Sequence, residues 1–212
     1  MAQKNTSSSD SVSPSICQRI PIVIVVEGKT EEEYFKAFIE EYKIKATVTN
    51  NGTCTSPLQI VQALERRKDK YGGNRTASVA LFVAVFDHCT DKDSKTKKDI
   101  YEEAIKLCQE KKFIAITSKP SFEFWLLLHF TNIDREMSSK ESEEQLKRFY
   151  PEYEKGSSKT FYDTKKYIRQ AIEYAEKTWK KERERTCAKE DWRKEEKGSY
   201  TNVHELIKKR LG

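Results

Sequence analysis

Short apolar runs alternate with amphipathic stretches along residues 20–130. Residues 22–26 form a continuous β-branched run, which is typical of a strand buried on both faces. The apolar residues between 34 and 39 then recur at the spacing of one helix face. The same patterns predict the following further elements: strands at 45–49, 79–86 and 113–117, and helices at 96–111 and 121–130.

Two helix starts are marked by capping sequences. Thr30 and Glu33 form a capping box, in which a hydroxyl and a carboxylate satisfy backbone amides of the first turn. Ser56 starts another helix, with Pro57 at the first helical position and Gln59 closing the box. Strand and helix thus alternate four times with short connections, which predicts a doubly wound, mostly parallel α/β sheet.

Beyond residue 138 only helical periodicity is present. An apolar stripe from Tyr167 to Trp179 predicts a long helix, and residues 203–211 predict the last one. Both charge signs crowd residues 180–197, which favours a solvated helix surface or a mobile segment. We therefore predict three parts: a disordered tail at 1–18, an α/β core at 19–132 and a helical part at 133–212 that packs on the core.

Composition and charge narrow the class of protein. The 212 residues include 40 Lys and Arg against 34 Asp and Glu, a formal net charge of +6 that permits a polyanionic ligand, although a well-solvated surface is the simpler explanation. The longest apolar run, residues 20–26, falls far short of the ~18 residues of a membrane span. The Ser-rich start lacks the apolar core of a signal peptide. The five cysteines are scattered without a Cys-x-x-Cys pair, so we expect a cytoplasmic protein with no disulfide framework.

Two acidic residues follow predicted strands, at the edge where open parallel sheets bind ligands. Glu27 ends the first strand just before Gly28, which allows a sharp turn, and Asp87 ends the strand predicted at 79–86. Two carboxylates at this edge suit Mg²⁺, which takes few protein oxygens and keeps waters for substrate phosphates. The alternative is structural: Glu27 caps a turn and Asp87 starts a loop.

The segment 118–130 is the most distinctive in the chain. Pro120 and Ser121 open a helix, which places Glu123 in its first turn and facing the same edge of the sheet. Capping is the simple role for Glu123, because a carboxylate in a first turn gains ~0.3–1 kcal/mol from the helix dipole. Its aromatic neighbours instead favour a carboxylate with a specific partner. His129 lies on an apolar face, where a hydrogen-bonded core histidine is more common than a ligand.

Four segments carry a resemblance to a known family: IVVEGKTEEEYFKAF, VFDHCTDKD, SKPSFEFWLLLHF and SYTNVHELI. In this order, and over residues 20–208, they resemble the signature segments of RloB-like proteins, bacterial proteins associated with restriction loci and abortive phage defence. The resemblance implies a Toprim-like (Rossmann-like) fold, a mostly parallel sheet flanked by helices with a helical C-terminal extension.

The resemblance also implies roles for individual residues. Glu27 is expected to act as general acid/base or metal ligand, and Asp87 as the first residue of an Asp-x-Asp pair that binds Mg²⁺ or Mn²⁺. From its position at the same edge, we add Glu123 as a further candidate catalytic carboxylate. The second position of that pair is Cys89, and a neutral thiol is a poor Mg²⁺ ligand. Asp91 is the candidate that compensates as a metal ligand from the following loop, or else it is a surface residue.

Substrate contacts are expected around the same edge. The residues proposed to bind nucleic acid are Gly28, Lys29, Lys119, Ser121, Asn202 and His204. Lys29 and Lys119 flank the crevice, and Asn202 and His204 belong to the last matching segment. Capping of the last helix is the more common role for a residue placed like Asn202.

Three functions follow as hypotheses. The first is a metal-dependent nuclease that cleaves DNA or RNA in antiphage defence, with a protein from the same defence operon as a candidate partner. The alternative is a non-catalytic nucleic-acid or partner-binding module, motivated by Cys89. The third is a phosphotransferase or nucleotide sensor that acts on small molecules. The sequence leaves the oligomeric state open.

Overall fold

The computed structural model describes the following residues of the chain: 20–50, 52, 56–72, 80–88, 95–187 and 198–211. The predicted tail at 1–18, Cys89 and Asp91 lie outside the described residues, and so does most of the charged segment 180–197. Among the helices in these ranges, none is both long enough and apolar enough to cross a membrane.

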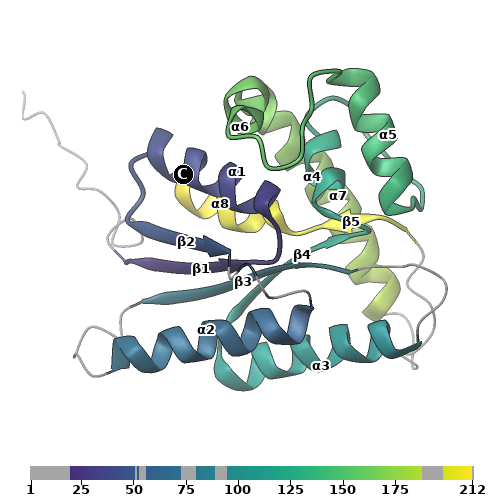
Figure 1. The fold of residues 1–212 in the computed structure, drawn as a ribbon. Coiled ribbons are helices and arrows are strands. Elements are labelled where there is room, and N and C mark those ends of the chain that lie inside the picture. Colours follow the sequence, from purple (N-terminus) through teal and green to yellow (C-terminus); the bar gives the residue numbers. More distant parts are fainter. Residues whose placement is uncertain are drawn as a thin grey trace, which may run out of the picture.

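Within these ranges, strands form one sheet, and helices cover both of its faces (Figure 1). Their spatial order is β2 (Ala46–Asn50), β1 (Ile22–Val26), β3 (Leu81–Asp87), β4 (Ile114–Lys119) and β5 (Tyr200–Thr201). The first four strands are parallel to their neighbours, and only β5 runs antiparallel, beside β4. The prediction of an α/β, Rossmann-like fold with a mostly parallel sheet is therefore confirmed.

The central strand β1 shows why the sequence forms this sheet. All of its residues are buried, because strands lie on both sides of it and helices cover both faces. Ile24 lies opposite Val48 of β2 and Val83 of β3. Alternate side chains point to opposite faces, so Val23 and Val25 belong to one hydrophobic cluster while Ile24 belongs to the other.

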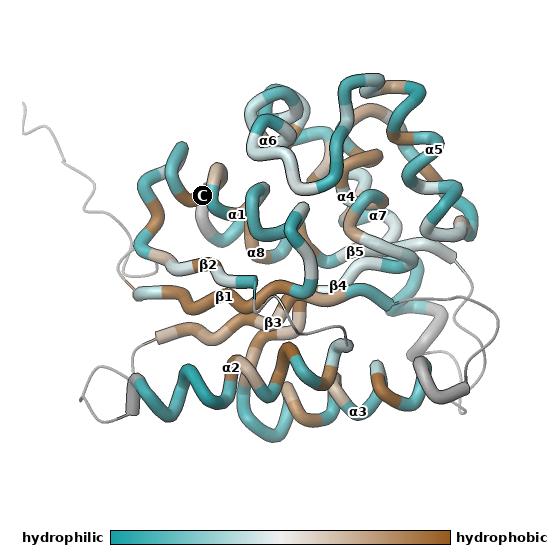
Figure 2. Tube along the Cα trace, in the orientation of Figure 1, coloured by the Kyte–Doolittle hydropathy of each residue, from teal (hydrophilic) through white to brown (hydrophobic). Residues whose placement is uncertain are grey.

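The helices follow in chain order: α1 (Lys29–Glu41), α2 (Pro57–Gly72), α3 (Lys95–Lys111), α4 (Phe122–Leu127), α5 (Ser139–Phe149), α6 (Lys159–Thr164), the 3-10 helix η3 (Lys165–Tyr167), α7 (Ile168–Cys187) and α8 (Val203–Leu211). Helices α2 and α3 cover one face of the sheet, and the others lie on the opposite side or beyond the β4–β5 edge (Figure 1). Hydrophobic residues line β1 and β3 and the inner faces of α2 and α3 (Figure 2). The larger hydrophobic cluster joins β1 to α4, α7 and α8, so the C-terminal helices share a core with the sheet.

His129 has the core role that its position suggested. The ring is fully buried, and its Nδ1 lies 3.1 Å from the carbonyl oxygen of Trp125. A carbonyl only accepts, so Nδ1 carries the proton and Nε2 accepts the hydroxyl of Tyr34, 3.3 Å away. Burial lowers the pKa of His129 to about 4, which keeps the ring neutral.

The capping box predicted at Thr30 is wrong. Helix α1 begins one residue earlier, with Gly28 as its N-cap and no side chain closing the end. Thr30 lies inside the first turn, where its hydroxyl accepts a hydrogen bond from the backbone amide of Gly156. The Thr30 hydroxyl, which the local pattern assigned to capping, is therefore used in a contact with a residue 126 positions away.

The expectation of helices alone beyond residue 138 is also incomplete, because β5 pairs with the end of β4. Asn202 extends this pairing: its side chain accepts from the amide of Thr117 at 2.6 Å and donates to the carbonyl of Ala115 at 3.1 Å. The expected cap at Asn202 is therefore wrong. The hydroxyl of Thr201 accepts from the Val203 amide at the start of α8 instead.

Candidate active site

The carboxylates predicted to meet at the edge of the sheet do so. Glu27 directly follows β1, and Asp87 is the last residue of the neighbouring strand β3. The backbone amide of Asp87 donates a hydrogen bond to Oε2 of Glu27 at 3.1 Å. Parallel pairing of β1 and β3 thus brings together two acidic residues that are 60 positions apart.

Glu31 is a third carboxylate at this edge, which the sequence analysis did not single out. It lies in α1 and is only 5% exposed, and its side chain bends back over Gly28. A Cβ atom added at Gly28 would lie 2.6 Å from Oε2 of Glu31. Gly28 therefore leaves the space in which this carboxylate lies, in addition to forming the turn.

Glu123 is the fourth carboxylate, and its oxygens are engaged on both sides. The hydroxyl of Ser121 donates to Oε2 at 2.7 Å. The hydroxyl of Tyr153 donates to Oε1 at 3.0 Å, and Nζ of Lys155 lies 3.5 Å from the same oxygen. Ser121 therefore orients this carboxylate instead of capping α4, in which it has no side-chain cap bond.

The connection between α5 and α6 closes over the site. Lys155 bridges two acids, because its Nζ also lies 2.9 Å from Oε2 of Glu143 on α5. The amide of Gly156 donates to Thr30 on α1 at 3.0 Å. Gly156 has a φ of +74°, and a Cβ there would lie 2.7 Å from Cγ of Lys29. A side chain at Gly156 would push this connection away from the start of α1.

Burial and mutual repulsion make these carboxyl groups hard to ionise together. Burial raises the pKa of Asp87 well above its usual value, and the nearby charges of Glu31, Glu27 and Glu123 raise it further. Burial also raises the pKa of Glu31 to about 7, with smaller contributions from Glu123 and Glu27, while Lys155 lowers it. The pKa of Glu27 is raised by burial, which the hydrogen bond from the Asp87 amide partly offsets.

The donor chemistry of this cluster fits a hard divalent cation. Carboxylate oxygens are the ligands that Mg²⁺ takes, and a bound cation would relieve the repulsion that adds to the effect of burial on the pKa of Asp87 and Glu31. Among the residues that the structure places, no three acidic, His or Cys side chains are arranged to hold one metal ion. Mg²⁺ is compatible with this spacing, since it usually binds one or two carboxylates and completes its shell with water and substrate phosphates.

Lys29 and Lys119, the two proposed phosphate contacts, have different environments. The side chain of Lys29 is 60% exposed and pairs with Glu32 and Glu33 on its own helix. Lys119 is buried, and its Nζ lies 3.7 Å from Oε1 of Glu136. Lys29 is therefore accessible from the protein surface, whereas Lys119 is not.

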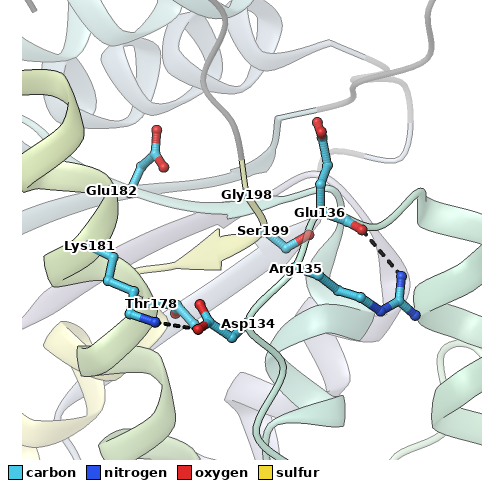
Figure 3. A pocket seen from close by; sticks show the side chains of 8 residues that line it. All are labelled: Asp134, Arg135, Glu136, Thr178, Lys181, Glu182, Gly198 and Ser199. Carbon is cyan, nitrogen blue, oxygen red and sulfur yellow. Dashed lines mark hydrogen bonds and ion pairs between the residues drawn. The ribbon is translucent and has the colours of Figure 1, made fainter.

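Glu136 belongs to a separate hollow beside β5, which Figure 3 shows from close by. Its lining residues are Asp134, Arg135, Glu136, Thr178, Lys181, Glu182, Gly198 and Ser199. Acidic and basic side chains alternate there, and Lys181 is paired with Asp134 (Figure 3). This mixed lining lacks the excess of one charge that would select a phosphate or a cation.

Asn202 and His204 are not brought to the carboxylates. The side chain of Asn202 is hydrogen-bonded to the backbone of β4. His204 is buried against α7, in a groove that it shares with Trp179, Lys180 and Arg183, and burial lowers its pKa. Neither side chain touches the cluster, so both remain candidates for substrate binding only if the substrate extends beyond it.

The sequence analysis missed Glu31, Tyr153 and Lys155. A weak signal for Glu31 exists, because it follows Glu27 by four residues within the same acidic run. No sequence signal marks Tyr153 and Lys155, because the charged stretch around them has the pattern of an ordinary solvated surface.

The fold and the site together define an α/β protein with buried carboxylates at the carboxyl edge of a parallel sheet. A family model, described as RloB-like protein, matches residues 22–209. The chain therefore belongs to the RloB-like protein family. No curated protein matches the chain. No solved structure matches it either.

Proposed function

We propose that this protein is a metal-dependent nuclease that cleaves phosphodiester bonds in nucleic acid. The observation that carries the proposal is the buried cluster of Glu27, Glu31, Asp87 and Glu123 at the carboxyl edge of the sheet, where burial and, to a smaller extent, mutual repulsion raise the pKa of Asp87 and Glu31. Folding places these charges together at a cost in stability. Such arrangements are typical of functional sites.

Glu27 and Asp87 are the residues that would hold Mg²⁺ or Mn²⁺, because they end adjacent strands and are already joined by a hydrogen bond. When bound, the cation would stabilise negative charge on the phosphate and lower the pKa of a coordinated water. Glu123 is less suited as a ligand, because Ser121, Tyr153 and Lys155 engage its oxygens.

The protein's own side chains have three tasks in this proposal. Glu31, with a pKa of about 7, takes up or releases a proton near neutral pH, as a general acid or base must. Glu123 and Glu143 position Lys155, whose charge then meets the phosphate at the mouth of the site. Lys29 is exposed at the start of α1, where it would contact a phosphate in exchange for its ion pairs with Glu32 and Glu33.

Metal-dependent cleavage of labelled DNA and RNA oligonucleotides tests the proposal. Cleavage with Mg²⁺ or Mn²⁺ is expected to stop in EDTA and to fall roughly 100-fold or more in Glu27→Gln and in Asp87→Asn. Glu33→Gln is the matched control, since Glu33 lies on α1 but is paired with Lys29 outside the cluster. Full cleavage by both cluster variants would refute the proposal. Tight binding without any cleavage would favour the non-catalytic module.

Antiphage defence is the biological role that we propose for this activity, and family membership supports it. We also propose that the α/β fold is of the Toprim type. Expression of the wild-type protein in a bacterial host is expected to lower the yield of phage. Expression of Asp87→Asn at the same level is expected to leave the yield unchanged. If wild type and Asp87→Asn protected the host equally, the defence role would not depend on the carboxylate cluster.

A further inference from the structure

An unusual group of aromatic side chains lies on the surface near α6 and η3. In the part of the chain that the structure describes, the large hydrophobic residues left exposed are all aromatic: Tyr42, Phe149, Tyr162 and Tyr167, at 38%, 50%, 41% and 36%. Single exposed apolar residues are common, but a cluster of rings marks an interaction site.

Ring contacts join these residues into two groups on either side of η3. Phe130 stacks on Phe149, with ring centroids 6.2 Å apart and planes at 10°, and lies 5.5 Å from the ring of Tyr167. On the other side, Phe161 contacts both Tyr42 and Tyr162, at 6.3 and 5.5 Å. Phe130 and Phe161 therefore support exposed rings from beneath.

Cations are interleaved with the rings. Nζ of Lys166 lies 4.8 Å from the ring centroid of Tyr167, and Nζ of Lys165 lies 5.4 Å from that of Tyr162. Lys165 is neutralised by Glu41. Lys166, Arg148 and Arg169 are exposed, and none of them has a carboxylate within ion-pair distance among the residues described. Lys166, which lies over the ring of Tyr167, therefore brings uncompensated positive charge to the group around Phe149 and Tyr167.

A ladder of rings connects this group to the proposed active site. Phe130 stacks on Tyr150 at 6.2 Å, and Tyr150 lies 6.2 Å from Tyr153. Tyr153 donates its hydroxyl to Glu123, one of the clustered carboxylates. A strand bound at Phe149 is thus only a few side chains away from the site at which we propose cleavage.

We propose that the surface formed by Phe149, Tyr167 and Lys166, the aromatic–basic face, binds single-stranded nucleic acid and leads it to the carboxylate cluster. The part of this inference that leads the strand to the carboxylate cluster rests on the proposed nuclease function. Bases of a single strand expose flat faces that stack on aromatic rings, while phosphates pair with neighbouring Lys and Arg. A duplex hides those faces within its own stack, so rings of this kind favour single strands.

Fluorescence anisotropy with labelled single-stranded and duplex oligonucleotides, in EDTA to prevent cleavage, tests the inference. Wild type is expected to bind the single strand more tightly than the duplex. Phe149→Ala and Tyr167→Ala are each expected to weaken single-strand binding roughly tenfold, because one stacked base contributes about 1–3 kcal/mol. Lys166→Ala is expected to reduce the salt slope by about 0.7.

Two controls keep the outcome interpretable. Phe149→Leu keeps an apolar contact with Phe130 and is expected to lose affinity as well, which separates stacking from simple burial. Lys140→Ala removes an exposed charge from the same helix, α5, and is expected to change nothing. Far-ultraviolet circular dichroism confirms that each variant is folded.

The results that would overturn the inference differ from those that would refute the nuclease. Unchanged single-strand binding in Phe149→Ala and Tyr167→Ala, or equal losses for duplex, would refute the aromatic–basic face even if cleavage persists. A self-association that Phe149→Ala abolishes, without an effect on binding, would make this face a contact between copies. Binding that depends on these rings, in a protein that never cleaves, would refute the nuclease alone.

Discussion

Replacing Glu31 by glutamine removes one buried carboxyl charge with almost no change in side-chain size. The pKa of Glu31 is raised from 4.5 to about 7, which corresponds to about 3 kcal/mol of lost stability once the group is ionised in the folded protein. The unfolded chain ionises first as pH rises from 4.5, so stability falls between pH 4.5 and about 7 and then levels off. Glu31→Gln is therefore expected to be more stable than wild type only at high pH.

Thermal unfolding in EDTA at two pH values measures this effect. At about pH 8 the variant is expected to unfold up to ~6–12 °C above wild type, since 1 kcal/mol shifts the midpoint by ~2–4 °C for a chain of this size. Near pH 4.5 the two proteins are expected to unfold together, and Mn²⁺ is expected to reduce the difference at high pH. Glu33→Gln, which removes a carboxylate paired with Lys29 outside the cluster, is the control that gains nothing. An equal shift at both pH values would refute ionisation of the buried Glu31 carboxyl group as its cause.

Further predictions concern the residues around the cluster. Asn202→Ala leaves the buried amide of Thr117 and the part-buried carbonyl of Ala115 without their partner, so urea unfolding is expected to show a loss of about 2 kcal/mol. An unaffected midpoint would mean that water replaces the amide. Gly28→Ala is expected to displace the Glu31 carboxylate and to slow cleavage roughly 10- to 100-fold with little effect on stability. A larger loss of stability than of rate would contradict this. Lys155 lowers the pKa of Glu31, so Lys155→Met is expected to shift the acid limb of the pH–rate profile to higher pH, and Lys155→Arg to restore it. An unshifted pH–rate profile would mean that Lys155 does not act on Glu31.

The parts of the fold that the sequence predicted are those that depend on local patterns. The strands β1 and β3 are apolar runs, the second ending in Asp87, and α2 starts at Pro57, directly after the predicted Ser56, whose hydroxyl accepts from the amide of Gln59. Glu27 and Asp87 were predictable as neighbours because parallel strands present their carboxyl ends at one edge of the sheet. Topology alone therefore locates half of the cluster.

The remaining features depend on contacts between distant segments. Lys155 reaches Glu123 only because the α5–α6 connection is fastened to α1 through Gly156 and Thr30. The strand β5 has two residues, too few for a periodicity. Glu31 lies in an acidic run that local patterning assigns to solvent, yet it is buried because the side of α1 that carries it faces Asp87 and Glu123.

Isothermal titration of Mg²⁺ and Mn²⁺ into the purified protein tests the role of the carboxylate cluster most directly. We predict binding by wild type and by Glu33→Gln, loss of binding in Glu27→Gln and in Asp87→Asn, and an affinity that rises with pH through about 7 as Glu31 ionises. Binding that survives in both cluster variants, or its absence in wild type even with nucleic acid present, would contradict a metal site between these two strand ends.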